Sequence, residues 1–337
     1  MQMYPPETIN LCTGVSHKPR PEDYITKKTA CSVAPPNTPH PLWTSFLDRI
    51  TDGNVELQKF LQRFVGYCCT GFTNEHVFVF AWGTGANGKS TFINTIARIF
   101  GTYATVADMN TFIASNNERH PTDLAKLYGA RLVVAQETQR GRHWDEAKIK
   151  AITAGDKITA RFMRQDYFDF DPTFKLFIIG NHKPQLHNTD EAIRRRMLLV
   201  PFVVQIPEHE RDRDLPQKLW DQERWAIMRW CVDGAAEWNR IGLLPPAVVR
   251  DATSDYFETE DTLGQWLTEC VERVLDPRTY TLTRDLFGSW KLWCEPRNLK
   301  PGSEKAFVES LLERNFNKQL DPDTRRSIFI SIVLRAP

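Results

Sequence analysis

The sequence has few of the features that mark membrane, secreted or zinc-binding proteins. No stretch approaches the run of about 18 apolar residues that a membrane helix requires, and the first residues show no basic-then-apolar signal pattern. The seven cysteines are odd in number and include no C-x-x-C pair, which argues against a disulfide framework or a zinc site. We therefore expect a reducing, cytosolic compartment and no membrane partner.

An excess of one charge is also missing. The net charge is +1 with 25% charged residues, so any affinity for nucleic acid must come from local patches rather than from a global basic field. The chain contains no internal repeat and no low-complexity block. Its length allows two or three domains of about 100 to 200 residues each. Composition alone neither favours nor excludes a DNA partner.

What the sequence does contain is a glycine loop between a strand and a helix. Trp82 to Thr91 spell WGTGANGKST, which matches G-x-x-x-x-G-K-[ST]. The apolar run before it, residues 76–82, predicts a strand buried on both faces. Apolar residues after the loop recur at helical spacing as far as Phe100, and Gly101 indicates a helix end. This context favours a phosphate-binding loop over a chance glycine turn.

A loop of this kind holds a polyphosphate mainly through backbone N–H groups that converge at a helix N-terminus. Lys89, which we expect to be exposed in the loop, would reach the β and γ phosphates, and Ser90 would ligate Mg²⁺. We therefore predict ATP and Mg²⁺ as cofactors. The predicted nucleotide-binding residues are Gly83, Thr84, Gly85, Ala86, Asn87, Gly88, Lys89, Ser90 and Thr91.

Two further apolar runs end in polar residues, as the ligand-binding edge of a nucleotide-binding sheet requires. The run at 131–137 ends in Gln136 and Glu137, and we predict that Glu137 polarises the attacking water or holds the metal through water. The run at 174–181 ends in Asn181, which can orient a water against a γ-phosphate. A helix cap or salt bridge for Glu137 and a turn for Asn181 are the structural alternatives.

Two more stretches carry candidate cations. Residues 158–170 are β-prone and predict a hairpin with a partly basic tip that includes Arg161 and Arg164. Residues 190–197, DEAIRRRM, place three arginines side by side. The planar guanidinium suits the charge that spreads over phosphoryl oxygens in a transition state, and a solvated basic turn is the alternative.

The remaining segments predict helices around this centre, a polar linker at 254–261, and a C-terminal ribbon with Arg325 and Arg326 near its turn. The predicted fold is α/β, a P-loop NTPase core whose parallel sheet lies between helices. The predicted divisions are 1–40 (linker or N-terminal arm), 41–74 (helical, oligomerisation segment), 75–205 (ATPase core), 206–260 (helical subdomain and linker) and 261–337 (winged-helix domain).

Several of these motifs together resemble the superfamily 3 helicases, specifically the helicase part of the phage and plasmid primase-helicases. WGTGANGKST resembles the first motif of that family, VVAQET with Glu137 its second, and FKLFIIGN with Asn181 its third. TAGD, followed by Arg161, resembles the additional motif of the family, and DEAIRRRM its arginine-finger segment. The SWKLWCEPRNLKPGSEKAF stretch is similar to the winged helix that often follows. The similarity covers most of residues 41–337.

The resemblance implies an AAA+-like core that assembles into a ring, usually hexameric, and hydrolyses ATP between subunits. It implies movement along single-stranded or forked DNA during replication in the cytoplasm of a bacterial or phage-infected cell, with a primase or polymerase as a further partner. Because no primase active site is recognisable, the chain would be a fragment or a stand-alone helicase. A ring ATPase that remodels or packages DNA without unwinding it, a small-molecule kinase and a structural DNA-binding protein are the alternatives.

The resemblance also assigns roles by position. The carried-over residues are Lys89 (phosphate), Ser90 (metal), Glu137 (catalysis and metal), Asn181 (γ-phosphate) and Arg195 (finger acting in trans). The hairpin would hold the DNA backbone through Arg161, Arg164 and Gln165. Gln136 stands where many members carry a second acidic residue, and Arg194 stands where an apolar residue is common. Metal ligation and the choice of finger among Arg194, Arg195 and Arg196 therefore stay open.

Overall fold

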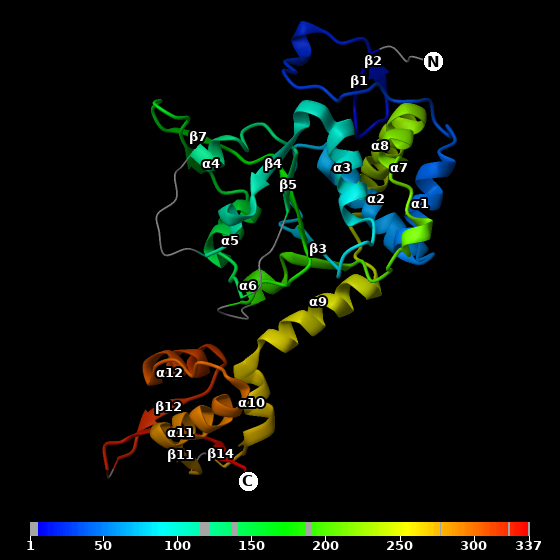
Figure 1. Ribbon diagram of the computed structural model, residues 1–337. Helices are drawn as coiled ribbons and strands as arrows, with labels where there is room; N and C mark the ends of the chain where they lie inside the picture. The colour runs from blue at the N-terminus through cyan, green and yellow to red at the C-terminus, as the bar shows by residue number, and fades with distance from the viewer. Residues whose placement is uncertain are drawn as a thin grey trace. The chain divides into compact units, whose positions relative to one another are not determined.

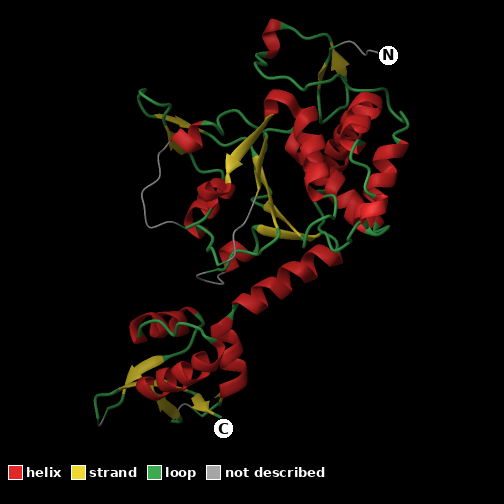
Figure 2. Cartoon of the chain, viewed as in Figure 1, coloured by secondary structure: helices red, strands yellow, loops and turns green. Residues whose placement is uncertain are grey.

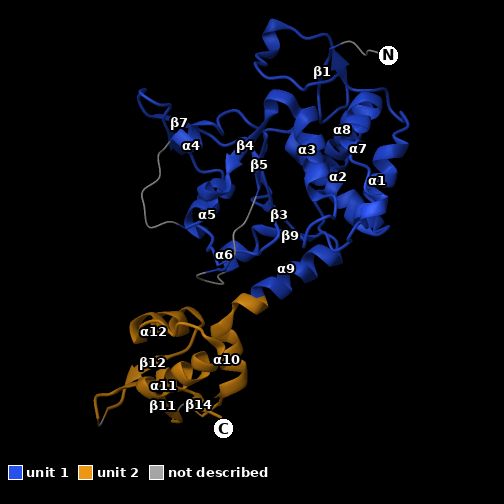
Figure 3. Ribbon diagram, viewed as in Figure 1, with its two compact units in different colours: residues 1–257 blue, residues 258–337 orange. Residues whose placement is uncertain are grey.

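The computed structural model describes residues 6–114, 122–136, 141–186, 191–276, 278–322 and 324–335. Figure 1 follows the chain, and Figure 2 shows its helices and strands. The chain divides into two compact units, Met1–Phe257 and Glu258–Pro337 (Figure 3). Within the described ranges, no helix is long and apolar enough to cross a membrane.

A five-stranded parallel sheet forms the centre of the first unit. Its strands are β3 Phe78–Trp82, β4 Ala104–Asp108, β5 Leu132–Gln136, β8 Lys175–Gly180 and β9 Met197–Pro201, in the spatial order β4-β5-β8-β3-β9. Every pairing is parallel, so the carboxyl ends of all five strands meet at one edge. The three apolar runs identified in the sequence are β3, β5 and β8, and their unbroken apolar character follows from burial on both faces.

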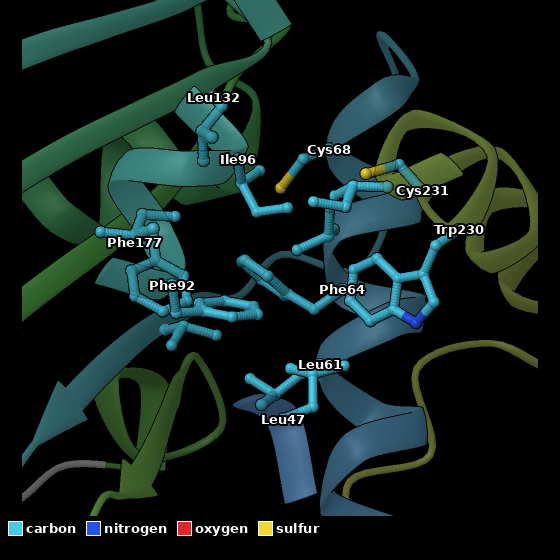
Figure 4. Packing of buried hydrophobic residues seen from close by; sticks show 14 of the residues in the cluster. Leu47, Leu61, Phe64, Cys68, Phe92, Ile96, Leu132, Phe177, Trp230 and Cys231 are labelled. Carbon is cyan, nitrogen blue, oxygen red and sulfur yellow. The ribbon is translucent and has the colours of Figure 1, made fainter. Parts of the chain in front are cut away.

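Four helices cover one face of the sheet: α1 Pro41–Thr51, α2 Val55–Cys69, α3 Lys89–Phe100 and α8 Arg224–Ile241. Figure 4 shows buried side chains of these helices packing together with side chains of the sheet. The rings of Phe64 on α2 and Phe92 on α3 each lie 6.0 Å from the ring of Phe177 on β8. The predicted break between the first two helices is present, since Asn54 caps α2 by accepting a hydrogen bond from the Leu57 amide at 3.0 Å.

The other face of the sheet packs against α5 Glu146–Ala154 and α9 Ala247–Glu260. Trp144 lies edge-on to Phe78 and Phe80 of β3, with ring centroids 5.8 and 5.5 Å apart. The short elements on this side are α4 Thr122–Ala125, β6 Ile158–Ala160, β7 Phe168–Phe170 and α6 Glu191–Arg194. The sheet therefore lies between two apolar layers, as the sequence predicts.

Part of the predicted linker at 254–261 is instead helical. Helix α9 runs through it to Glu260, and Tyr256 and Phe257 are each 2% exposed. Their rings supply the apolar anchor that a polar and charged stretch concealed in the sequence. The predicted segment 41–74 is likewise an internal layer of the first unit, because ten of the fifteen residues of α2 are buried.

The N-terminal residues also differ from the solvated arm that their composition suggests. Two short strands, β1 Thr8–Ile9 and β2 Ser16–His17, pair with each other. The amide of Ala30 then donates to the Ile99 carbonyl of α3 at 2.9 Å, and that of Ala34 to the Trp225 carbonyl of α8 at 3.1 Å. Backbone hydrogen bonds therefore hold this segment to the core, although its side chains carry no helical or strand periodicity.

A buried carboxylate connects α1 to the chain before α8. Helix α7 Leu215–Lys218 continues through a π-helical turn, Leu219–Glu223, into α8. Glu223 is 5% exposed, and its carboxylate accepts hydrogen bonds from the Leu42 and Trp43 amides at 2.9 and 2.8 Å. A negative charge on the first-turn amides of α1 both satisfies them and complements the helix dipole.

The second unit has its own core of aromatic side chains. Its elements are α10 Thr262–Cys270, β10 Val271–Arg273, β11 Tyr280–Leu282, α11 Thr283–Cys294, α12 Glu304–Glu313, β12 Lys318–Leu320, β13 Ser327–Ile330 and β14 Ile332–Leu334. Trp266 contacts Trp290 and Phe307 with ring centroids 5.9 and 5.5 Å apart. The three helices and the C-terminal ribbon follow the predicted order, with β11, β13 and β12 forming one sheet.

The contact between α2 and α8 yields a stability prediction. A Cβ on Gly66 would lie 2.1 Å from backbone atoms of Gly234 and Ala235, so Gly66→Ala should lower the free energy of unfolding by about 1–3 kcal/mol or more. Gly288→Ala on α11 is the control, because nothing lies within 4 Å of its added Cβ. The control should be neutral or stabilising by about 0.5–1 kcal/mol. Equal urea midpoints for Gly66→Ala and the parent would contradict the close approach.

Candidate nucleotide site

The loop between β3 and α3 accepts only glycine at two motif positions. A Cβ on Gly83 would come within 2.2 Å of the Phe202 carbonyl oxygen. Gly88 has φ +80, and its added Cβ would lie 2.3 Å from Cγ2 of Ile50. Backbone conformation and close packing therefore explain the glycines before any ligand is considered.

The loop leads into a helix whose first turn lacks a protein cap. Gly88 is the N-cap of the twelve-residue helix α3 and offers no side-chain hydrogen bond. Among the hydrogen bonds of the described chain, none is donated by the backbone N–H groups of residues 84–91. Uncapped N–H groups at the positive end of a helix dipole form an anion-binding site. The loop thus fits the phosphates of a nucleotide.

Lys89 is buried at the centre of this loop, which corrects the expectation that it is exposed. Its side chain is 3% exposed, and Nζ donates to the Gly83 carbonyl oxygen at 2.7 Å, to Oδ1 of Asn87 at 3.0 Å and to Oδ1 of Asn181 at 3.4 Å. Burial lowers the pKa of Lys89 to about 8. All three partners are neutral oxygens, so a phosphate would supply a counter-charge that these contacts do not.

The carboxyl edge of the sheet brings several predicted residues together. Asn181 directly follows β8 and contacts Lys89, while Gln136 ends β5, the next strand in the sheet. Gln136 Nε2 donates to Oδ1 of Asn94 on α3 at 3.0 Å. Glu137, the predicted catalytic carboxylate, lies outside the described residues. The structure therefore places the strand that leads to Glu137 and leaves its role a prediction.

Ser90 is exposed in the first turn of α3, beside the loop. No group of three or more His, Cys, Asp or Glu side chains that could hold a metal ion occurs within the described ranges. Mg²⁺ at nucleotide sites typically uses only one or two protein ligands together with phosphates and water. The Ser90 hydroxyl fits that donor set.

Asn87 has a structural role that its place in the motif did not reveal. Its side chain is 4% exposed, with Nδ2 donating to the Phe202 carbonyl at 3.0 Å and Oδ1 accepting from Lys89. Asn87 therefore ties the glycine loop to the end of β9. The spacing of the motif leaves this position unspecified, so no sequence signal pointed to it.

The arginine segment lies at the opposite edge of the sheet. Arg195 precedes β9, and the Arg196 carbonyl accepts from the Phe78 amide at the start of β3 at 2.8 Å. The five residues of β3, at about 3.3 Å each, separate this edge from the glycine loop by about 16 Å. The structure therefore does not bring Arg195 to the loop of its own chain.

The three arginines have different surroundings. Arg194 Nη2 donates to Oγ of Ser254 on α9 at 3.0 Å, and Arg196 Nη1 donates to the Ala192 carbonyl at 2.7 Å. Arg195 is exposed, and within the described part of the chain its guanidinium makes no hydrogen bond or ion pair. Among the three, Arg195 is thus the side chain that the described residues leave without a hydrogen bond or ion pair.

Helix α9 contacts strand β9 and the segment that follows β8. Oγ1 of Thr253 accepts from the Leu199 amide at 3.0 Å. The Tyr256 hydroxyl donates to the Pro184 carbonyl, and Lys183 Nζ lies 4.5 Å from the ring of Trp82 and 5.6 Å from that of Tyr256. These single residues carry no motif, so sequence reasoning missed their support of the Asn181 loop.

The predicted hairpin is present and projects away from the sheet (Figure 1). Strands β6 and β7 pair antiparallel, and the Gln165 amide donates to the Phe162 carbonyl at 3.1 Å to close the turn. Arg164 has φ +62 and no hydrogen bond or ion pair to any described residue. The structural alternative for Arg164 is an ion pair with Asp166 or Asp169 that stiffens the hairpin. Neither ion pair is present among the described residues, and Asp169 accepts a hydrogen bond from Oγ1 of Thr159 at 2.6 Å.

The chain is similar to a family of unknown function and to viral proteins named as helicases. Residues 81–196 match a family of unknown function, DUF5906. The chain is 23% identical over 308 residues to "Putative helicase L207/L206" of Acanthamoeba polyphaga mimivirus, covering 86% of this chain and 30% of that protein. It is 24% identical over 262 residues to "Putative helicase 022R" of Frog virus 3 (isolate Goorha), covering 70% and 26%. The chain thus spans less than a third of these relatives.

The fold also matches solved structures. The apo structure of the NrS-1 C-terminal region aligns with a TM-score of 0.54 at 9% identity, over 98% of this chain and 83% of that one. The A form apo structure of that region gives a TM-score of 0.53 at 11% identity, over 97% of this chain and 82% of that one. The likeness supports a P-loop-like α/β core.

The buried cation at the loop predicts a pH dependence of stability. Because the pKa of Lys89 falls from 10.5 to about 8 on folding, the unfolded chain binds more protons between these values, and stability rises with pH across that window. Lys89→Met lacks this titration. The free energy of unfolding of the variant minus that of the parent should therefore fall by up to about 3 kcal/mol between pH 8 and pH 10.5. Lys175, whose pKa burial also lowers to about 8, is common to both proteins and cancels. Urea titrations at several pH values measure the difference, and a constant difference would contradict the burial of Lys89.

Proposed function

We propose that this chain is the motor part of an ATP-dependent DNA helicase of superfamily 3. The observation that carries the proposal is the glycine loop, which leads into the uncapped first turn of α3 and holds a buried ammonium that contacts Gly83, Asn87 and Asn181. The relatives named as helicases and the P-loop-like fold support the same class. ATP would bind at residues 83–91, with Ser90 on the phosphate-bound Mg²⁺.

Each residue near the loop then has a task in hydrolysis. Lys89 would neutralise charge on the β and γ phosphates, and Asn181, 3.4 Å from it, would orient the water or sense the γ-phosphate. Glu137 would accept the proton of the attacking water. Many members of the family that the sequence resembles carry a second carboxylate at the position of Gln136. Here the Gln136 amide donates a hydrogen bond to Asn94, so Glu137 would be the sole carboxylate at the end of β5.

The proposed motor is a ring of subunits, because the helicases that the sequence resembles usually assemble as hexamers. Arg195 is exposed about 16 Å across the sheet from its own glycine loop, which supports a finger that acts on a neighbouring subunit. The hairpin lies before β8, on the same amino edge as Arg195. In a ring, the amino edge of one subunit would thus contribute both the finger and the DNA contact.

The second unit is included in the proposal as a winged helix. The order α10, β11, α11, α12, β12, β13 and the β12–β13 ribbon, whose connecting turn carries Arg325 and Arg326, fit that fold. The exposed charge on α12 is net negative, because Glu304, Glu309 and Glu313 are exposed together with a single basic residue, Lys305, and the other exposed residues, Ala306 and Leu312, are apolar. Because like charge repels phosphates, we assign the principal DNA contact to the hairpin of the first unit.

Hydrolysis tests the nucleotide assignment. Lys89→Ala should reduce ATP hydrolysis by orders of magnitude, because the cation facing the phosphates is lost. Glu137→Gln should retain ATP binding without turnover, since the amide cannot accept a proton. The parent should hydrolyse ATP faster with single-stranded DNA present, whereas a small-molecule kinase would not respond. Parent-rate hydrolysis by Glu137→Gln would refute its catalytic role.

Mixing of inactive subunits tests the finger. A finger supplied by a neighbour is worth about 10³ to 10⁵ in rate, so Arg195→Ala should be inactive alone. Mixed with Lys89→Ala under conditions that exchange subunits, it should recover activity at interfaces that pair an intact loop with an intact arginine. Arg194→Ala is the matched control, because Arg194 is bonded to Ser254 of its own chain. Mixing without recovery would count against action in trans.

A further inference from the structure

The hairpin tip exposes rings and a thioether that a phosphate contact alone does not require. Met163 is 70% exposed, Tyr167 58% and Phe162 41%. They lie within the turn and the residues beside it, between β6 and β7. Exposed apolar side chains gathered at one projecting tip indicate a contact surface, whereas single exposed apolar residues are ordinary.

The hairpin is rigid enough to hold these rings in place. Phe162 stacks on Phe168 with ring centroids 5.4 Å apart and planes 16° from parallel, and Phe168 stacks on Phe170 at 5.8 Å. Phe170 is 5% exposed and belongs to the apolar layer below the sheet, and Tyr128 lies edge-on to both lower rings at 5.7 and 5.4 Å. The series of rings thus runs from the core to the tip.

Each exposed ring has one face covered by the protein. Phe168 covers one face of Phe162, and the Arg161 guanidinium lies 5.0 Å from the ring of Tyr167. A half-covered ring offers its other face to a planar partner. Arg161 and Arg164 add positive charge beside the rings, and Arg164 is not neutralised by any described residue. A planar base joined to a phosphate backbone matches both features.

We propose that Phe162 and Tyr167 form a base-stacking platform for single-stranded DNA, with Arg164 holding the adjoining phosphate. The inference rests on the proposed function and specifies which chemical part of the strand the hairpin contacts. Stacking accepts every base, because each has a π face, so the platform fits a motor that moves without sequence preference. The phosphate contact alone would give affinity that depends on salt but not on the presence of bases.

Binding to a single strand and to a length-matched abasic strand separates stacking from phosphate contact. Phe162→Ala and Tyr167→Ala should each weaken binding to the normal strand by about tenfold, with an unchanged salt slope. The parent should bind the abasic strand correspondingly more weakly, and the two variants should lose little further affinity for it. Arg164→Ala should weaken binding to both strands equally and reduce the salt slope by about 0.7 per lost phosphate contact.

Control variants keep the result interpretable. Tyr167→Phe retains the ring and should bind like the parent, and Tyr24→Ala removes a ring that is 89% exposed in the N-terminal segment and should change nothing. Because the substituted rings are exposed, all variants should melt at the temperature of the parent. That result would exclude misfolding as the cause of weaker binding. Two results would overturn the platform and leave the proposed function intact. The parent could bind normal and abasic strands equally, or both ring variants could bind the normal strand as tightly as the parent does.

Two other outcomes also refute it. Ring variants that change subunit assembly in size-exclusion chromatography while binding DNA normally would show that a second copy of the chain covers the tip. A parent protein that binds no single strand and shows no DNA-stimulated hydrolysis would overturn the proposed function together with the platform. Loss of affinity confined to the base-bearing strand is the result that supports the inference.

Discussion

The structure depends on how the Lys89 ammonium is held among neutral oxygens at the carboxyl edge of the sheet. The partners of Nζ come from the glycine loop and from the residue after β8, so the cation joins two neighbouring strands at their ends. Its burial carries a cost that the lowered pKa expresses, and a phosphate placed on the uncapped amides of α3 would offset that cost. Glycine at 83 and 88 is needed because the loop packs against Phe202 and Ile50 on the way.

The parallel sheet places the two groups of predicted site residues at opposite edges. Its carboxyl edge holds the glycine loop, Gln136 and Asn181, while Arg195 and the hairpin attach at its amino edge. The glycine loop and Arg195 of one chain therefore lie at opposite edges of the sheet, so under the proposed function an arginine would reach a loop only from a neighbouring subunit. Helix α9 contacts both the arginine segment, through Ser254, and the loop after Asn181, through Tyr256, so it is placed to respond to changes at either edge.

The sequence was informative where residue type is dictated by local geometry. Glycines with positive φ, apolar runs buried on both faces and helical spacing gave β3, β5, β8, α3 and the hairpin, because each pattern has one dominant physical cause. It was uninformative where a side chain's role depends on distant contacts. The burial of Lys89, the cap that Glu223 provides for α1 and the anchoring of α9 by Tyr256 arise from residues far apart in the chain. Polar composition likewise concealed the helical stretch within 254–261, since two aromatic rings suffice to bury one side of it.

We propose that nucleotide hydrolysis at the loop drives movement along a DNA strand. Unwinding of a forked duplex by the parent chain, with ATP compared against a non-hydrolysable analogue, tests this claim most directly. Strand separation is expected with ATP and Mg²⁺ and none with the analogue, although the analogue should still support DNA binding. DNA-stimulated hydrolysis without strand separation would instead identify a motor that remodels or packages DNA, and equal separation with both nucleotides would contradict the account.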